Sequence, residues 1–195
     1  MSKMKTKDNR KPASSSPLES LEETSVYIVL LRGINVSGKN KLPMAELRTL
    51  LTSLGFQNVQ TYIQSGNIIL ESDKSKTETC QIIKQGIKDK FGYDLPVIAR
   101  TKKEWKKAID NYPFSIENEK IVAFTFLDKI PDVKEIEVTS IKEDKYKIFD
   151  DVVYLHCPST FASTKLSNNL FERKLKVTAT TRNLRTTIKL LKLIE

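Results

Sequence analysis

The residues with the clearest chemical potential lie in one loop, which runs from Leu31 to Lys41. Gly33 to Lys39 matches the pattern G-x-x-x-x-G-K, in which backbone N–H groups and a lysine hold the phosphates of a nucleotide. The pattern next requires Ser or Thr as a magnesium ligand, and this chain has Asn40. Pro43 also predicts a helix that starts too late to bring Lys39 into its first turn. We therefore do not expect ATP hydrolysis.

A wider set of polar residues in predicted turns and at predicted helix starts could bind an anion. Helix starts expose free N–H groups that suit phosphate or carboxylate, and arginine adds a planar bidentate donor. The candidates are Arg32, Asn35 and Lys39 after the first strand, Gln64, Ser65 and Asn67 in a hairpin turn, Lys165 at one helix start, and Thr181, Arg182 and Asn183 at the last. The alternative is structural, with the amides satisfying loop backbone groups and Arg32 pairing with an acid. The sequence leaves open whether these segments meet.

Catalytic and metal chemistry find little support in the residue types. His156 and Cys157 are neighbours at a predicted strand end, so their side chains point to opposite faces and cannot form a dyad. One histidine and two cysteines do not suggest a metal centre. We predict no catalytic residue, no metal site and no cofactor.

The composition is that of an ordinary globular protein, with 39% hydrophobic and 29% charged residues among 195. No apolar run approaches the roughly 20 residues that span a bilayer, and the N-terminus lacks a signal-peptide pattern, so we expect a cytoplasmic protein without a membrane partner. The net charge of +9 is unevenly spread: residues 25–116 carry +6, residues 117–151 carry −4, and residues 163–195 carry +6. This distribution favours anionic partners, nucleic acid or a phosphorylated small molecule. A solvated, lysine-rich surface is the alternative reading.

The elements that position these residues predict an α+β fold with two units. Residues 1–24 lack periodic apolar positions and are expected to form a disordered tail. Residues 25–100 predict the order βαββαβ, which is that of ferredoxin-like folds. Capping boxes at Ser75–Glu78 and Thr101–Glu104 mark two helix starts. Gly66 and Asn67 are expected to supply the positive φ angles of the hairpin turn.

Residues 101–195 are expected to form a second, smaller α+β unit, and Trp105 is expected to anchor it to the first. The predicted elements are a strand from Ile121 to Leu127, a poorly patterned stretch 131–142, a hairpin about Asp150-Asp151, and helices around 164–175 and 183–194. The third strand of the first unit lacks the base-stacking aromatics of an RNA-recognition domain, so we do not expect that module.

Several of these segments together resemble the family called domain of unknown function 1697, from about Tyr27 to Leu193. The resemblance is carried by Leu30 to Val36, Pro43-Met44, Leu54 to Phe56, Thr61 to Asn67, Ser163 to Leu166, and Ala179 to Asn183. It implies a soluble, mostly bacterial α+β protein with ferredoxin-like elements. It implies no established activity.

The chain departs from the family pattern in three places. Ser159 to Ala162 contains no glycine, which weakens a tight backbone cradle there. Leu184 replaces a tryptophan that could stack on a ligand or pack in the core. The segment 131–142 is shorter than usual, so we expect a helix to be missing.

Together these observations predict a protein that binds an anionic ligand without catalysis. Two alternatives stay open. One is an enzyme whose loop cations and amides stabilise charge on a phosphate or carbonyl oxygen. The other is a protein–protein adaptor that uses an exposed sheet.

Overall fold

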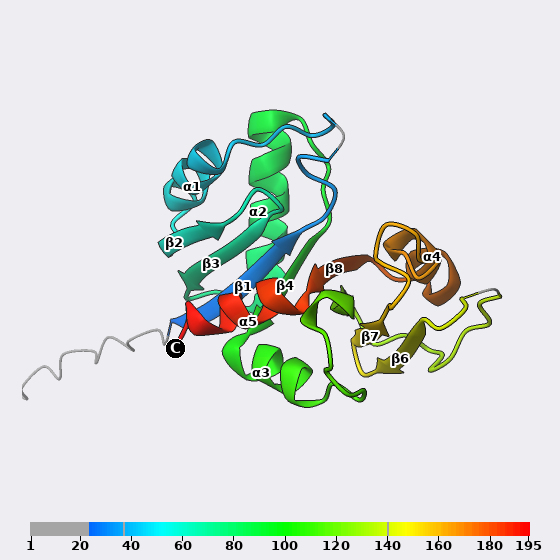
Figure 1. Cartoon of the computed structure of the whole chain (residues 1–195). Coiled ribbons are helices and arrows are strands. Elements are labelled where there is room, and N and C mark those ends of the chain that lie inside the picture. The colour runs from blue at the N-terminus through cyan, green and yellow to red at the C-terminus, as the bar shows by residue number, and fades with distance from the viewer. Residues whose placement is uncertain (1–23, 37, 140) are drawn as a thin grey trace, which may run out of the picture.

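The computed structural model describes residues 24–36, 38–139 and 141–195, so the expected tail lies outside the described residues except for Thr24. The first half forms a four-stranded antiparallel sheet in the order β2-β3-β1-β4 (Figure 1). Its elements are β1 (Ser25–Leu31), α1 (Met44–Ser53), β2 (Gln57–Tyr62), β3 (Asn67–Ser72), α2 (Lys76–Phe91) and β4 (Val97–Thr101). The expected βαββαβ order is confirmed, and the apolar run of β1 is explained by its central position, buried on both faces.

The second half forms another antiparallel sheet, in the order β6-β7-β5-β8. Its elements are α3 (Lys102–Asp110), the short 3-10 helix η1 (Glu119–Ile121), β5 (Val122–Leu127), β6 (Lys145–Phe149), β7 (Val152–His156), α4 (Asn168–Leu175), β8 (Ala179–Asn183) and α5 (Leu184–Lys192). The strand orders of the two sheets correspond position by position. One difference is that a helix, α1, joins β1 to β2, whereas the described residues between β5 and β6, 128–139 and 141–144, form no helix.

Three apolar clusters hold these layers together. One lies between the first sheet and helices α1 and α2, and another lies between the second sheet and α4. The middle cluster joins the two sheets, α3 and α5, with Trp105 fully buried at its centre. The indole of Trp105 stacks on Phe126 and donates a hydrogen bond to the Thr187 carbonyl at 3.0 Å. Both contacts lie within residues 101–195, while the same cluster includes Ile28 and Ile98 of the first half. The role of Trp105 as an anchor between the halves stays a prediction. The domain boundaries expected at residues 24/25 and 100/101 stay predictions.

The expected capping boxes are confirmed, whereas the expected hairpin turn is only partly correct. Both capping boxes are present, at Ser75 and Thr101. Positive φ is found at Gly66 (75°), but the same expectation is wrong for Asn67, which begins β3, and Ile63 takes the second such position (50°). The reason is that the Asn67 amide closes the turn from the strand, donating to the carbonyl of Tyr62 at 3.1 Å.

The last two helices differ from their expected bounds. Helix α4 starts at Asn168 and not near 164, because the preceding segment is held in turns. Asp144 anchors those turns by accepting hydrogen bonds from the backbone and hydroxyl of Ser159, at 3.1 and 2.6 Å. Helix α5 starts at Leu184, so Arg182 belongs to strand β8 and not to a helix start.

Candidate functional site

Arg182 is a buried connector between the two sheets. It is 8% exposed, and burial lowers the pKa of its guanidinium to about 10. All five of its N–H groups have acceptors, which are the Asn67 side chain, the Thr180 hydroxyl, and the carbonyls of Thr181, Leu31 and Ser65. Because none of these donors is free, Arg182 does not offer the open bidentate surface expected for an anion.

The loop after β1 and the hairpin turn do meet, which the sequence left open. The backbone N–H of Leu31 donates to the Gly66 carbonyl at 2.8 Å. The Asn35 amide donates to the carbonyls of Gln64 and Leu42 at 2.9 and 3.0 Å, and it accepts from the N–H of Leu42. These amides therefore satisfy backbone groups, as the structural alternative predicted.

Most of the remaining candidates bond other groups of the protein, and two have exposed side chains. Arg32 binds both carboxylate oxygens of Glu172, at 2.7 and 2.6 Å, and the amide oxygen of Asn169 at 2.7 Å. Asn183 caps α5 by accepting from the N–H of Thr186. Thr181 bonds the side chains of Thr125 and Asn168, and Ser65 bonds Asn67. The side chains of Lys39 and Gln64 are exposed.

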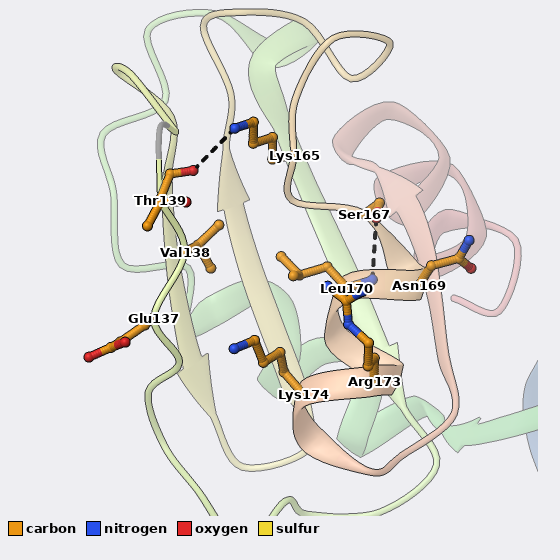
Figure 2. A pocket seen from close by; sticks show the side chains of 9 residues that line it. All are labelled: Glu137, Val138, Thr139, Lys165, Ser167, Asn169, Leu170, Arg173 and Lys174. Atoms are coloured by element: carbon orange, nitrogen blue, oxygen red, sulfur yellow. Dashed lines mark hydrogen bonds between the residues drawn. The ribbon is translucent and has the colours of Figure 1, made fainter.

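Among the candidates, Lys165 lines a sizeable cleft in the described structure. The cleft measures about 560 Å³ and lies between α4 and the segment Glu137–Thr139 (Figure 2). Its walls are formed by Glu137, Val138, Thr139, Lys165, Ser167, Asn169, Leu170, Arg173 and Lys174. Leu170, Arg173 and Lys174 share one face of α4, because residues three and four apart are neighbours on a helix. This spacing is visible in the sequence, but it is equally typical of a solvated helix face and was not singled out as a site.

The charge in this cleft is predominantly positive. Arg173 and Lys174 have no carboxylate or hydrogen-bond partner among the described residues. Among the described residues, the Lys165 ammonium donates one hydrogen bond, to the Thr139 carbonyl at 3.5 Å. Figure 2 shows the Glu137 carboxylate directed away from the cleft, and the Lys174 side chain directed toward the segment 137–139. The cations are therefore available to an anion.

The course of the chain explains why the cleft exists. In the first half, α1 packs beside α2 against the sheet. In the second half, the corresponding connection includes the segment 131–139, which forms no helix beside α4. Arg32 fixes α4 from outside the cleft, through Glu172 and Asn169. The cleft therefore lies between α4 and a stretch, 131–139, that forms no helix.

The cysteine and histidine expected to be structural lie apart from this cleft. Burial raises the pKa of the Cys157 thiol to about 11, and its sulfur lies 3.8 Å from the Thr164 hydroxyl. The His156 ring contacts Tyr112 and Phe114 instead. The described residues contain no group of three or more His, Cys, Asp and Glu side chains that could hold a metal ion, and none of their helices is long and apolar enough to cross a membrane.

Comparison with known proteins agrees with this architecture. The family model described as "Protein of unknown function (DUF1697)" matches residues 24–154. Among solved structures, the chain is similar to the conserved bacterial protein SP0830 from Streptococcus pneumoniae, with a TM-score of 0.69 and 24% sequence identity over 89% of this chain and 100% of that one. A likeness at this identity shows a shared α+β fold. No curated protein matches.

Proposed function

The chain belongs to the DUF1697 family of proteins of unknown function, and from that premise we propose that it binds a small phosphorylated molecule in the cleft beside α4. The observation that carries the proposal is the set of three cations around one cleft. One cation, Lys165, precedes α4, and two, Arg173 and Lys174, lie in its last turn. None of the three has a carboxylate partner among the described residues.

The size and lining of the cleft suit a small molecule. Its volume of about 560 Å³ falls in the range of roughly 300–1,000 Å³ that is usual for ligand sites. Val138 and Leu170 supply apolar surface for the uncharged part of a ligand, while the cations contact its phosphate. Helix α4 has no acidic residue in its first turn, so the positive potential of its N-terminus adds to the same attraction.

The proposal is limited to binding. An enzyme would need a base beside a nucleophile in the cleft; the lining has the hydroxyls of Thr139 and Ser167, but its one carboxylate, that of Glu137, points outward. The adaptor alternative needs an exposed sheet face, whereas the central strands of both sheets are buried.

Thermal unfolding with added pyrophosphate or glucose 6-phosphate tests this proposal, because a ligand that binds the folded state alone raises Tm. The wild type should be stabilised in proportion to the logarithm of ligand concentration. The triple variant Lys165→Gln, Arg173→Gln, Lys174→Gln should lose the shift. A matched triple variant, Lys88→Gln, Lys90→Gln, Lys103→Gln, removes the same charge elsewhere and should keep it. Equal shifts in all three proteins would refute the site.

A further inference from the structure

A second basic cleft lies on the outer face of α5, away from α4. It measures about 430 Å³ and is lined by Tyr62, Glu119, Leu184, Arg185, Ile188, Lys189 and Lys192. Arg185, Lys189 and Lys192 are exposed, and a carboxylate or hydrogen-bond partner is recorded for none of them within the described chain. This cleft shares no lining residue with the one beside α4.

The three cations form a line along the helix. They stand at positions i, i+4 and i+7, which lie on one face of an α-helix. With a rise of about 1.5 Å per residue, the line extends over roughly 10 Å. The opposite face of α5, with Leu190 and Thr187, is buried in the middle apolar cluster. A row of charges of this length suits successive phosphates of a polyanion better than one small anion.

Arg185 has an electrostatically unfavourable place in the helix itself. It lies in the first turn, where the helix dipole favours acidic residues and disfavours cations. Helices α1, α2 and α3 follow the rule with Glu46, Glu78 and Glu104, whereas α5 has no acidic residue in that turn. The positive end of the dipole therefore adds to the charge of Arg185 and is offset in this cleft by Glu119 alone among the lining residues.

Tyr62 brings an aromatic ring to the same cleft. It ends strand β2, its side chain is half-buried, and no partner for its hydroxyl is recorded among the described residues. Aromatic rings next to basic grooves stack unpaired bases in proteins that bind single strands. The sheet faces used by RNA-recognition domains are not available here, because Ile28, Leu30 and Ile69 are buried under the second half of the chain.

We propose that the α5 cleft binds single-stranded nucleic acid, with backbone phosphates on Arg185, Lys189 and Lys192 and a base stacked on Tyr62. The affinity then depends on salt, since each phosphate contact releases a counterion and contributes about −0.7 to the slope of log affinity against log salt. Loss of the three cations therefore makes the slope less negative by about 2. Loss of the ring weakens binding and leaves the slope unchanged.

Fluorescence anisotropy with a labelled mixed-sequence DNA 12-mer tests this binding at several salt concentrations. The variant Arg185→Gln, Lys189→Gln, Lys192→Gln should bind at least tenfold more weakly with a shallower slope. Tyr62→Leu should bind about fivefold more weakly or worse, with the slope of the wild type. The control variant Lys88→Gln, Lys90→Gln, Lys103→Gln should change both the affinity and the slope less than the α5 triple variant does.

Two results would overturn the proposal. One is wild-type affinity and slope in the α5 triple variant, and the other is an equal loss in the control. Circular dichroism of each variant confirms that it is folded. Arg185, Lys189 and Lys192 are exposed, so their replacement leaves the core untouched. Tyr62 packs against the middle apolar cluster, and leucine keeps an apolar side chain at that position. The variant Lys165→Gln, Arg173→Gln, Lys174→Gln should keep most of the oligonucleotide affinity, so failure of the α4 site and failure of the α5 site are distinguishable.

Discussion

Arg100 and Arg182 cross the interface between the two sheets in opposite directions and end on corresponding carbonyl oxygens. Arg100, in β4, donates to the carbonyl of Leu127 at the end of β5, at 2.5 Å. Arg182, in β8, donates to the carbonyl of Leu31 at the end of β1, at 2.9 Å. Each also reaches a carbonyl in the hairpin of the opposite sheet, that of Asp151 or Ser65. The two halves are therefore joined by a reciprocal pair of arginines.

Replacing Arg182 should destabilise the fold strongly. In Arg182→Gln, the carbonyls of Leu31 and Ser65 lose a buried donor, and a buried unsatisfied acceptor costs about 1–3 kcal/mol. We expect the free energy of unfolding, measured with urea, to fall by about 3 kcal/mol. Arg185→Gln, on the exposed face of α5, should change it by less than about 0.5 kcal/mol. Comparable losses in the two variants would contradict the buried connection.

At Arg100, the contribution of the carbonyl contacts can be measured separately from that of an ion pair. Arg100 also pairs with the Asp151 carboxylate at 2.8 Å. Arg100→Gln removes the carbonyl contacts and the ion pair together, so it should cost about 3 kcal/mol. Asp151→Asn leaves the carbonyl contacts in place and should cost about 1 kcal/mol. If urea unfolding shows Asp151→Asn to be the more damaging change, the ion pair dominates and the account of reciprocal carbonyl contacts is wrong.

Glu104 makes part of the stability depend on pH. Burial alone would raise the pKa of its carboxyl group, but the Lys76 ammonium at 2.5 Å and the N–H of Thr101 lower the pKa overall. A pKa below the ordinary 4.5 means that the stabilisation is present above pH 4.5 and is lost as the pH falls through the lowered value. Urea midpoints between pH 7 and pH 3 should therefore fall less in Glu104→Gln than in the wild type. Parallel curves would contradict the assigned contacts.

The two cysteines should differ in reactivity. Cys157 is buried, and its pKa is raised to about 11. Cys80 is partly exposed, and burial also raises the pKa of its thiol. Because the thiolate is the reactive form and needs access to the reagent, iodoacetamide at pH 8 should label Cys80 first. Peptide mass spectrometry over time measures both rates, and faster labelling of Cys157 would reopen a nucleophilic role for it.

The elements predicted best are those whose causes are local in sequence. The capping boxes at Ser75 and Thr101, the apolar run of β1 and the burial of Trp105 all follow from residue types within one segment. The role of Arg182 could not be predicted in this way, because its acceptors Leu31 and Ser65 are 151 and 117 residues distant. From the sequence alone, a basic residue near a helix start is predicted to be an exposed anion ligand, because its burial is not known.

The candidate sites were hidden for a related reason. The cleft beside α4 depends on the segment 131–139, which forms no helix, and on Arg32, which bonds Glu172 of α4. A segment without a helix has no periodic pattern, so the sequence does not show that it borders a cleft or which residues line that cleft. The cations of α4 and α5 follow helical spacing, yet that spacing alone is equally typical of a solvated helix face. Their grouping around defined clefts is information that only the structure supplies.

The most direct measurement of the central claim is calorimetric titration of pyrophosphate into the full-length protein at low ionic strength. The account predicts saturable binding at one site that is lost in the Lys165→Gln, Arg173→Gln, Lys174→Gln variant and retained in the Arg185→Gln, Lys189→Gln, Lys192→Gln variant. Saturable binding that survives unchanged in the first variant, or heats no different from dilution in the wild type, would contradict it.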